Sequence, residues 1–246
     1  MQQEIKSNAI NKHIKNRQWR TAKAAAVIAF IAGPAISLPF QSWSVLQGDY
    51  AITLVALFLF LSSVVVAFIF RSRGRKMDRL ISGEEIIISW ILDEETKKAY
   101  VNHLFTSEKG KNNGLFIVIA LFMVLFFGLF IIFIDEGRWM MFLFFLVITA
   151  FIALFAFGMP YYYRFRNNRG DGYVIIGRKY AYVNGFFHNW DFPLSGLKEV
   201  RVIQKPFYGI HLRYYYYDRT LRNEELLTIP ANKNTDLNEL IDKLKT

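Results

Sequence analysis

The chain has 246 residues, of which 53% are hydrophobic and 17% aromatic, and it carries a formal net charge of +10. Its hydrophobic residues gather in long unbroken runs, which argues against a water-soluble globule. The absence of cysteine excludes disulfides, thiolate metal sites and cysteine nucleophiles, and it suits a reducing cytosol.

The chain opens with a basic segment, residues 1–22, that we expect on the cytosolic side. Ile5, Ala9, Ile10 and Ile14 are interspersed with Lys and Arg. This pattern fits a short amphipathic helix on an anionic membrane surface, and it fits a solvated, frayed start equally well.

Four apolar runs without a charged residue follow. Each is 17 to 22 residues long, and about 20 helical residues at 1.5 Å each cross a hydrocarbon core of roughly 30 Å. The sequence therefore predicts four transmembrane helices. The runs are Ala24–Phe40, Ala51–Phe70, Leu115–Ile134 and Trp139–Pro160.

The basic residues predict the orientation of these helices, because Lys and Arg collect on the cytoplasmic side. Six precede the first run, none lies in the first loop, nine lie in the second, one in the third and 14 in the tail. We expect a multi-pass protein of the plasma (inner) membrane with both termini in the cytoplasm. The net charge follows the membrane boundary, so no nucleic-acid partner is expected.

Small residues line one face of the first run. Ala25, Ala29, Gly33 and Ser37 recur every four residues, and Pro34 interrupts the helix. This face predicts close helix packing or, in an oligomer, one wall of a pore. Since the runs contain no ionisable residue, ion-coupled transport is disfavoured, whereas a pore gated by apolar side chains needs none.

Basic clusters flank the second and fourth runs and are candidate binding sites for lipid headgroups. Anchoring of the topology explains them equally well. The candidate residues are Arg71, Arg73, Arg75, Lys76, Arg79, Arg164 and Arg166.

The loop 71–113 between the two helix pairs, 23–70 and 114–160, contains structure of its own. Ile86–Leu92 predicts a short apolar strand or buried turn. Asp93 suits the N-cap of an amphipathic helix from about Glu94 to Ser107. We therefore expect a folded platform beneath the membrane.

The C-terminal region 161–246 changes to short strands separated by turns. Asn184-Gly185 indicates a tight hairpin, and Leu237, Leu240, Ile241 and Leu244 share one face of a last helix. The expected strands are Tyr173–Ile176, Tyr180–Val183, Phe186–Phe192, Leu197–Gln204, Gly209–Tyr217 and Glu225–Ile229, with 218–223 as a polar turn. Six strands and a closing helix predict a small, partly open β-barrel plugged by that helix.

This order resembles the bacterial pleckstrin-homology-like domains that are fused to membrane spans. The resemblance is carried by Tyr173–Ile176, the Asn184-Gly185 turn, Trp190–Pro193, Leu197–Val200 and the terminal helix, and it covers about the last third of the chain. It implies an α+β fold, with a cytosolic barrel closed by the C-terminal helix, and a binding or assembly module without catalysis. It transfers no site residue.

Aromatic side chains at Trp90, Tyr214 and Tyr216 form a candidate interaction patch, with cover by the neighbouring helix or lipid as the alternative. His13, His103, His188 and His211 are scattered, and no phosphate-binding glycine loop or nucleophile elbow is present. We expect no catalytic residue, no metal site and no cofactor.

These observations predict a non-enzymatic integral membrane protein whose cytosolic PH-like module binds partners at the inner leaflet. Expected partners are membrane lipids and either further copies of the chain or another membrane protein. The alternative is an oligomeric channel or membrane-disrupting effector gated by its cytosolic domain.

Overall fold

The computed structural model of the chain describes residues 14–42, 44–192, 194–218 and 221–245. Most of the predicted N-terminal amphipathic segment, residues 1–13, lies outside this part. The chain divides into two compact units, each assembled from separated segments: residues 1–89, 174–196 and 214–224 form unit 1, and residues 90–173, 197–213 and 225–246 form unit 2.

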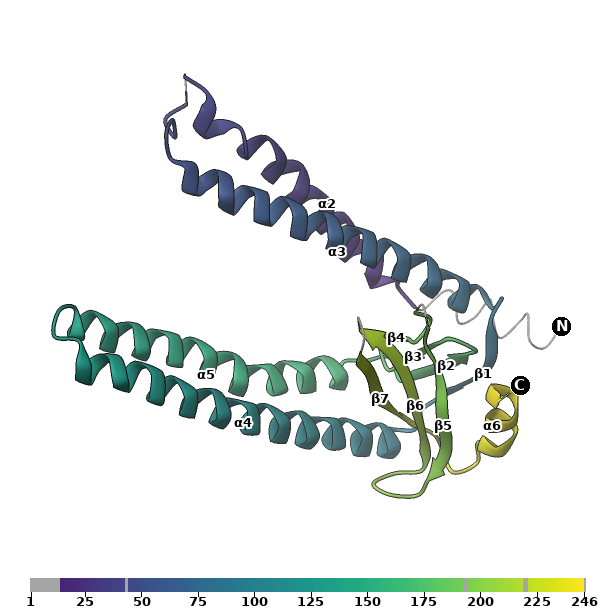
Figure 1. Cartoon of the computed structure of the whole chain (residues 1–246). Coiled ribbons are helices and arrows are strands. Elements are labelled where there is room, and N and C mark those ends of the chain that lie inside the picture. The colour runs from purple at the N-terminus through teal and green to yellow at the C-terminus, as the bar shows by residue number, and fades with distance from the viewer. Residues whose placement is uncertain (1–13, 43, 193, 219–220, 246) are drawn as a thin grey trace. The chain divides into compact units, whose positions relative to one another are not determined.

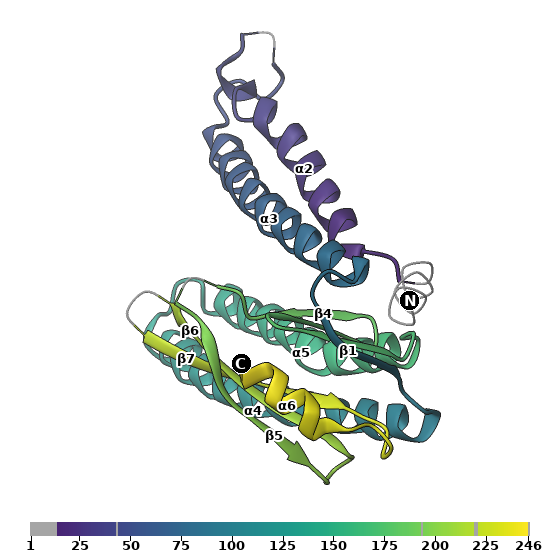
Figure 2. The same ribbon diagram turned by 90° about the vertical axis from the view of Figure 1, so that its right-hand side faces the viewer.

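Four helices are long and apolar enough to cross a membrane, which supports a multi-pass membrane protein. They are α2 (Arg17–Ala35, continued by the short helix η1, Leu38–Phe40), α3 (Tyr50–Ser82), α4 (Glu94–Phe133) and α5 (Arg138–Asn168). In unit 1 α2 lies along α3, and in unit 2 α4 lies along α5, as both views show (Figure 1, Figure 2).

Three of these helices extend well beyond their apolar runs. α3 continues twelve residues past Phe70 and ends where Gly83 adopts the left-handed conformation (φ 96°). α4 joins the predicted helix at Glu94–Ser107 and the third run in one 40-residue helix. No proline interrupts this helix, and its three glycines, Gly110, Gly114 and Gly128, weaken a helix without ending it.

The start of α4 follows the predicted capping. Asp93 Oδ1 accepts a hydrogen bond from the Thr96 backbone N at 2.7 Å, and Glu94 and Glu95 occupy the positive first turn. α5 continues through Pro160 to Asn168. α3, α4 and α5 therefore each connect an apolar run to the β region without a break.

The strands form two sheets. The first has the order β1-β2-β3-β4 and consists of β1 (Ile86–Ile91), β2 (Tyr173–Gly177), β3 (Tyr180–Val183) and β4 (Phe186–Asn189). The second has the order β5-β6-β7 and consists of β5 (Gly196–Ile203), β6 (Gly209–Asp218) and β7 (Leu221–Pro230). The strand predicted after the second run is thus β1, and it joins the first sheet.

The predicted barrel is wrong, because the two sheets are not closed onto each other. The reason lies at the link between them. β4 ends at Asn189 rather than at Phe192, and a turn follows in which the Ser195 backbone N donates to the Phe192 carbonyl at 3.1 Å. β5 then pairs with β6 instead of extending the first sheet.

The hairpin of β3 and β4 follows the prediction closely. Val183 pairs with Phe186, so the connection has two residues, Asn184 and Gly185, and both have positive φ (49° and 94°). Two positive φ angles define the type I′ turn that matches strand twist. The register places Tyr182 opposite Phe187 and Tyr180 opposite Asn189.

The last helix, α6 (Leu237–Lys245), also matches the prediction. Leu237, Leu240, Ile241 and Leu244 are all buried, and α6 lies next to β5 in both views (Figure 1, Figure 2). Buried strand residues such as Val200, Ile210, Leu212 and Ile229 supply the apolar core of this sheet. Amphipathic periodicity was sufficient to find this contact.

A prediction concerns the packing of β2 in unit 1. A Cβ at Gly177 would lie 2.7 Å from the Glu85 carbonyl oxygen and 2.9 Å from Leu80 Cδ1, so Gly177→Ala forces the backbone to move. We expect it to lower the free energy of unfolding by about 1–3 kcal/mol, measured on the full chain in detergent by tryptophan fluorescence.

The matched control for this prediction is Gly110→Ala. No atom lies within 4 Å of a Cβ at this helical position. Replacing glycine by alanine there should stabilise the chain, by up to about 1 kcal/mol. Equal unfolding free energies for the two variants would contradict the proposed close approach at Gly177.

Candidate functional site

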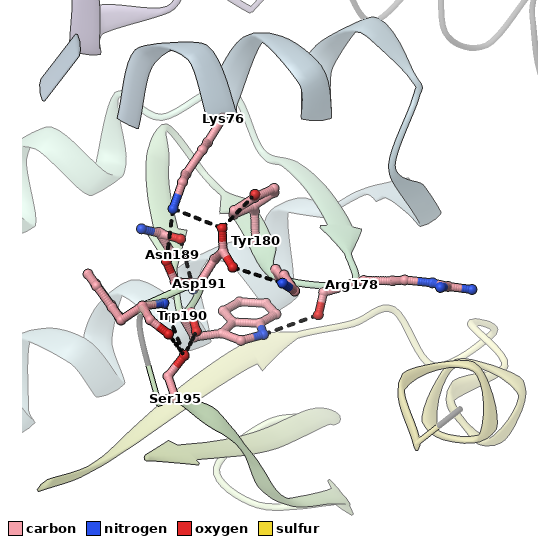
Figure 3. A network of polar contacts seen from close by, with 9 residues as sticks. Lys76, Arg178, Tyr180, Asn189, Trp190, Asp191 and Ser195 are labelled. Carbon is pink, nitrogen blue, oxygen red and sulfur yellow. Dashed lines mark hydrogen bonds and ion pairs between the residues drawn. The ribbon is translucent and has the colours of Figure 1, made fainter. Parts of the chain in front are cut away.

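A network of polar contacts in unit 1 joins α3, beyond its apolar run, to the β3–β4 hairpin. We call it the junction network and define it as Arg73, Lys76, Lys179, Tyr180 and Asp191. Lys76 and Arg73 lie three residues apart on α3, so they project from the same face of the helix. Figure 3 shows the Lys76 side chain reaching from α3 toward Asp191.

Asp191 is the centre of this network. Its Oδ2 lies 2.9 Å from Lys76 Nζ and accepts a hydrogen bond from the Tyr180 hydroxyl at 3.1 Å, while Oδ1 accepts from Lys179 Nζ at 2.9 Å. Lys76 Nζ also donates to the Asp191 backbone carbonyl at 2.8 Å. One lysine thereby binds both the side chain and the main chain of a residue 115 positions away.

The segment around Asp191 is itself held by short-range bonds. The Asp191 backbone N donates to Asn189 Oδ1 at 3.0 Å, and Trp190 Nε1 donates to the Arg178 carbonyl at 3.2 Å. Ser195 Oγ lies 2.6 Å from the Trp190 carbonyl oxygen (Figure 3). The carboxylate therefore presents a defined geometry to the lysines.

The electrostatics keep the Asp191 carboxylate ionised. Burial acts to raise its pKa, but hydrogen bonds from Lys179 and Lys76, the charge of Lys76 and the Tyr180 hydroxyl outweigh burial and lower the pKa to about 2. Burial, together with the neighbouring Asp191 carboxylate, raises the pKa of Tyr180, so its hydroxyl remains a proton donor. Near pH 7 Asp191 therefore stays ionised and Tyr180 stays protonated.

Arg73 forms the second link between α3 and the hairpin. Its guanidinium donates to the Phe187 carbonyl at 2.8 Å and lies 5.5 Å from the centre of the Phe187 ring. Arg73 Nε also donates to Gln18 Oε1 on α2 at 3.3 Å. One side chain thus connects α2, α3 and β4.

The start of α2 is fastened to the same stretch of α3. Asn16 Nδ2 donates to the Gly74 carbonyl at 2.9 Å and to Asp78 Oδ1 at 2.7 Å, and Trp19 Nε1 donates to Asp78 Oδ2 at 2.7 Å. A Cβ at Gly74 would lie only 3.0 Å from the Trp19 ring, so a glycine permits this contact.

His188 lies beside this region with its Nε2 atom buried and without a hydrogen-bond partner among the described residues. Burial lowers its pKa, and the nearby positive charge of Arg73 lowers it further, to about 4. His188 is therefore neutral near pH 7. In the described ranges no three His, Asp or Glu side chains gather as a metal site would require.

The structure divides the predicted lipid-binding residues into two groups. Arg73 and Lys76 are engaged by the hairpin, whereas Arg71, Arg75 and Arg79 are exposed. On α5 the Arg164 guanidinium stacks 4.7 Å from the Phe105 ring and donates to Asn102 Oδ1 at 3.3 Å. Arg166 lies 5.8 Å from the centre of the Tyr162 ring.

The predicted small-residue face of the first run packs within unit 1. Ala25 and Ala29 are buried, and a Cβ at Gly33 would lie 3.5 Å from Phe60 of α3. Pro34 lies inside α2, and its carbonyl accepts a hydrogen bond from Ser37 Oγ at 2.9 Å.

An apolar groove of about 560 Å³ lies between α2 and α3. Among the described residues that line it Asp49 alone is ionisable, and the other lining residues include Ile28, Ala32, Ile52 and Leu59. A lining of this kind suits an acyl chain or another helix. It provides no group for catalysis.

The three predicted aromatic residues of the interaction patch fall in different units. Trp90, in unit 2, donates from Nε1 to the Pro230 carbonyl at 3.1 Å. Tyr214 and Tyr216, in unit 1, stack on Trp190 and Phe192 with ring centres 6.1 and 5.9 Å apart. All three side chains are half-buried.

Sequence reasoning did not identify the junction network. Trp190-Asp191 stood out only as part of the resemblance, and no role was assigned to Asp191, Lys179 or Tyr180. A lone Asp after a Trp gives no local signal, because its partner lies on a helix more than 100 residues earlier.

Comparison of the chain with known protein families, with curated proteins and with solved structures found no match.

The first prediction for this site concerns Asp191. Since its pKa in the folded chain lies below its ordinary value of 3.8, the carboxylate stabilises the fold above about pH 4, and this contribution is lost as the pH falls toward 2. Asp191→Asn should lower the free energy of unfolding at pH 7 by about 1–2 kcal/mol, measured in detergent.

The control is Asp135→Asn. Asp135 pairs with Arg138 at 2.6 Å, but its carboxylate is 94% exposed, so the pair should contribute little. If Asp191→Asn unfolds at the same midpoint as Asp135→Asn, the junction network does not hold the hairpin.

The second prediction concerns His188. With a pKa of about 4 in the folded chain and an ordinary value of 6.5 when unfolded, the unfolded chain binds more protons between these values, so stability rises with pH from about 4 to 6.5. In ¹⁵N-histidine NMR spectra the His188 signal, identified through His188→Gln, should titrate near pH 4. Arg73→Met should move this midpoint upward, and a wild-type midpoint near 6.5 would contradict the burial of His188.

Proposed function

We propose that this protein is a non-enzymatic, multi-pass protein of the plasma (inner) membrane whose β sheets act as an interaction or assembly module at the cytoplasmic surface. The four apolar helices and the distribution of Lys and Arg support this topology, with both termini in the cytoplasm. With this topology, nearly all of the chain that can fold outside the bilayer lies on the cytoplasmic side of the membrane.

The junction network is the observation that carries the proposal. Lys76 binds Asp191 and Arg73 binds the Phe187 carbonyl, so the β3–β4 hairpin is fixed to α3 just beyond its apolar run. A flexible linker would be sufficient for a module that only needed to be tethered to the membrane. A hairpin fixed in this way presents a constant surface at a constant distance from the membrane, which suits the recognition of another membrane-bound partner.

The chemistry of the described residues supports binding rather than catalysis. Asp191 remains ionised and Tyr180 protonated, so neither group accepts or releases protons near neutral pH. We also propose that these sheets are related to the bacterial PH-like domains. The order of strands and turns in the sequence supports this relationship. The expected partner is a second copy of the chain or another membrane protein.

The proposal predicts protein contacts at the exposed sheet surface. A photo-crosslinking residue at Leu226, which lies on β7 and is 48% exposed, should yield a discrete protein adduct in native membranes at wild-type expression. Co-expression of two differently tagged copies identifies a self-adduct. Leu121, 66% exposed on the apolar part of α4, is the matched control and should give chiefly lipid adducts.

Two further exposed positions, Arg178 and Glu199, extend the scan over the rest of the sheets. A single adduct of constant size at any of the three sheet positions supports an interaction module. No protein adduct above the level seen at Leu121 at all three positions would contradict the proposal.

A further inference from the structure

Unit 1 carries exposed apolar side chains that its own fold does not cover. They lie in two segments, the turn after β4 and the ends of β6 and β7. They include Phe192 (43% exposed), Leu194 (77%) and Leu221 (72%). The Phe192 ring lies 5.9 Å from the Tyr216 ring, so the two segments are neighbours. A cluster of large apolar side chains on a surface outside the membrane marks a contact site.

The backbone of Leu194 adopts a conformation that glycine and asparagine adopt more readily than leucine. Its φ is 59°, in the left-handed region, which costs a residue with a Cβ about 1–2 kcal/mol relative to glycine. A glycine or asparagine would relieve this strain, and folding gains little from a leucine that is mostly exposed. The leucine side chain is therefore explained by a contact outside the unit rather than by the stability of the turn.

The junction network places this surface near the membrane. Phe192 follows Asp191, which is bound to Lys76, and Lys76 lies six residues after Phe70, the last residue of the apolar run. Six helical residues rise about 9 Å, and the headgroup layer of one leaflet is roughly 5–7 Å thick. The turn is thus anchored at the depth where the headgroup layer meets water.

The composition of the surface matches this location. Aromatic rings are enriched at membrane–water interfaces. Unit 1 also carries exposed cations, since Arg71 and Arg75 lie on the stretch of α3 that contains Lys76, and the Arg222 guanidinium lies 4.2 Å from the Tyr215 ring and 3.7 Å from Glu224 Oε1. Arginines at this depth attract anionic headgroups, while the apolar side chains insert among the headgroups.

We infer that Phe192, Leu194 and Leu221 form a membrane-contact patch that inserts into the leaflet from which α3 emerges. The occupant of this surface is the bilayer that holds the chain's own helices. The patch acts as a second anchor beside the junction network and goes beyond the proposed interaction module, since it requires lipid and no protein partner.

The chain contains no cysteine, so single cysteines can be introduced cleanly. Leu194→Cys and Leu221→Cys, each labelled with the fluorophore NBD, are reconstituted as the full chain in nanodiscs of phosphatidylcholine and phosphatidylglycerol. Arg178→Cys, an exposed position at the β2–β3 turn, is the matched control. We expect blue-shifted emission and about twofold quenching by lipids with a doxyl group near the headgroup at 194 and 221, but not at 178.

The outcomes separate the possible occupants. Iodide quenching at 194 and 221 equal to that at 178, without doxyl quenching, means that the surface faces water and overturns the inference. Blue-shifted emission without doxyl quenching means that protein covers the patch, and also overturns it. A loss of all crosslinks at Leu226 would count against the proposed function but would leave these fluorescence results unchanged. The two proposals can therefore fail independently.

A second variant tests the role of Leu194 without threatening the fold. Leu194→Asn removes the apolar side chain and suits a positive φ, so it should raise the unfolding midpoint in detergent. In nanodiscs it should reduce doxyl quenching of the label at position 221. Unchanged quenching at 221, with the midpoint raised, would remove Leu194 from the patch.

Discussion

The contact between Lys76 and Asp191 is the constraint on which the arrangement of unit 1 depends. A partly buried carboxylate is tolerated only when charge and hydrogen bonds compensate for lost water, and Asp191 has two ammonium groups and a phenol as partners. The lysine also binds the main chain of Asp191, so the strand end cannot rotate away without losing both bonds. Both side chains of this pair are mostly buried, 20% exposed for Lys76 and 28% for Asp191, so the bond is screened less than an ion pair on the surface.

Because α3 is unbroken, the bond between Lys76 and Asp191 connects the hairpin to the apolar run. α3 has no proline and ends only at Gly83, so the residues that bind the hairpin belong to the same rigid element as the residues of the apolar run. Asn16 and Trp19 attach α2 to that stretch through Asp78, and Arg73 connects it to Gln18. A displacement of the α2–α3 pair is therefore transmitted to the hairpin.

Local patterns were sufficient to predict much of the fold. The charge-free runs predicted the spans, Asn184-Gly185 predicted the β3–β4 hairpin, and the spacing of four apolar residues predicted the face of α6. Closure of the sheets and the position of Asp191 were beyond this reasoning, because both depend on contacts between distant segments. β5 pairs with β6 and not with β4, and the bonds that Ser195 makes in the turn after β4 leave no periodic pattern in the sequence.

The basic cluster after the second run shows how one segment can satisfy two requirements. Arg71, Arg75 and Arg79 recur every four residues and remain exposed, whereas Arg73 and Lys76 bind the hairpin. At 100° per residue Arg71 points away from Arg73, whereas Arg79, three residues after Lys76, lies on the side of Lys76. Positive charges placed to hold a helix in the membrane can thus serve also as the attachment of a folded domain.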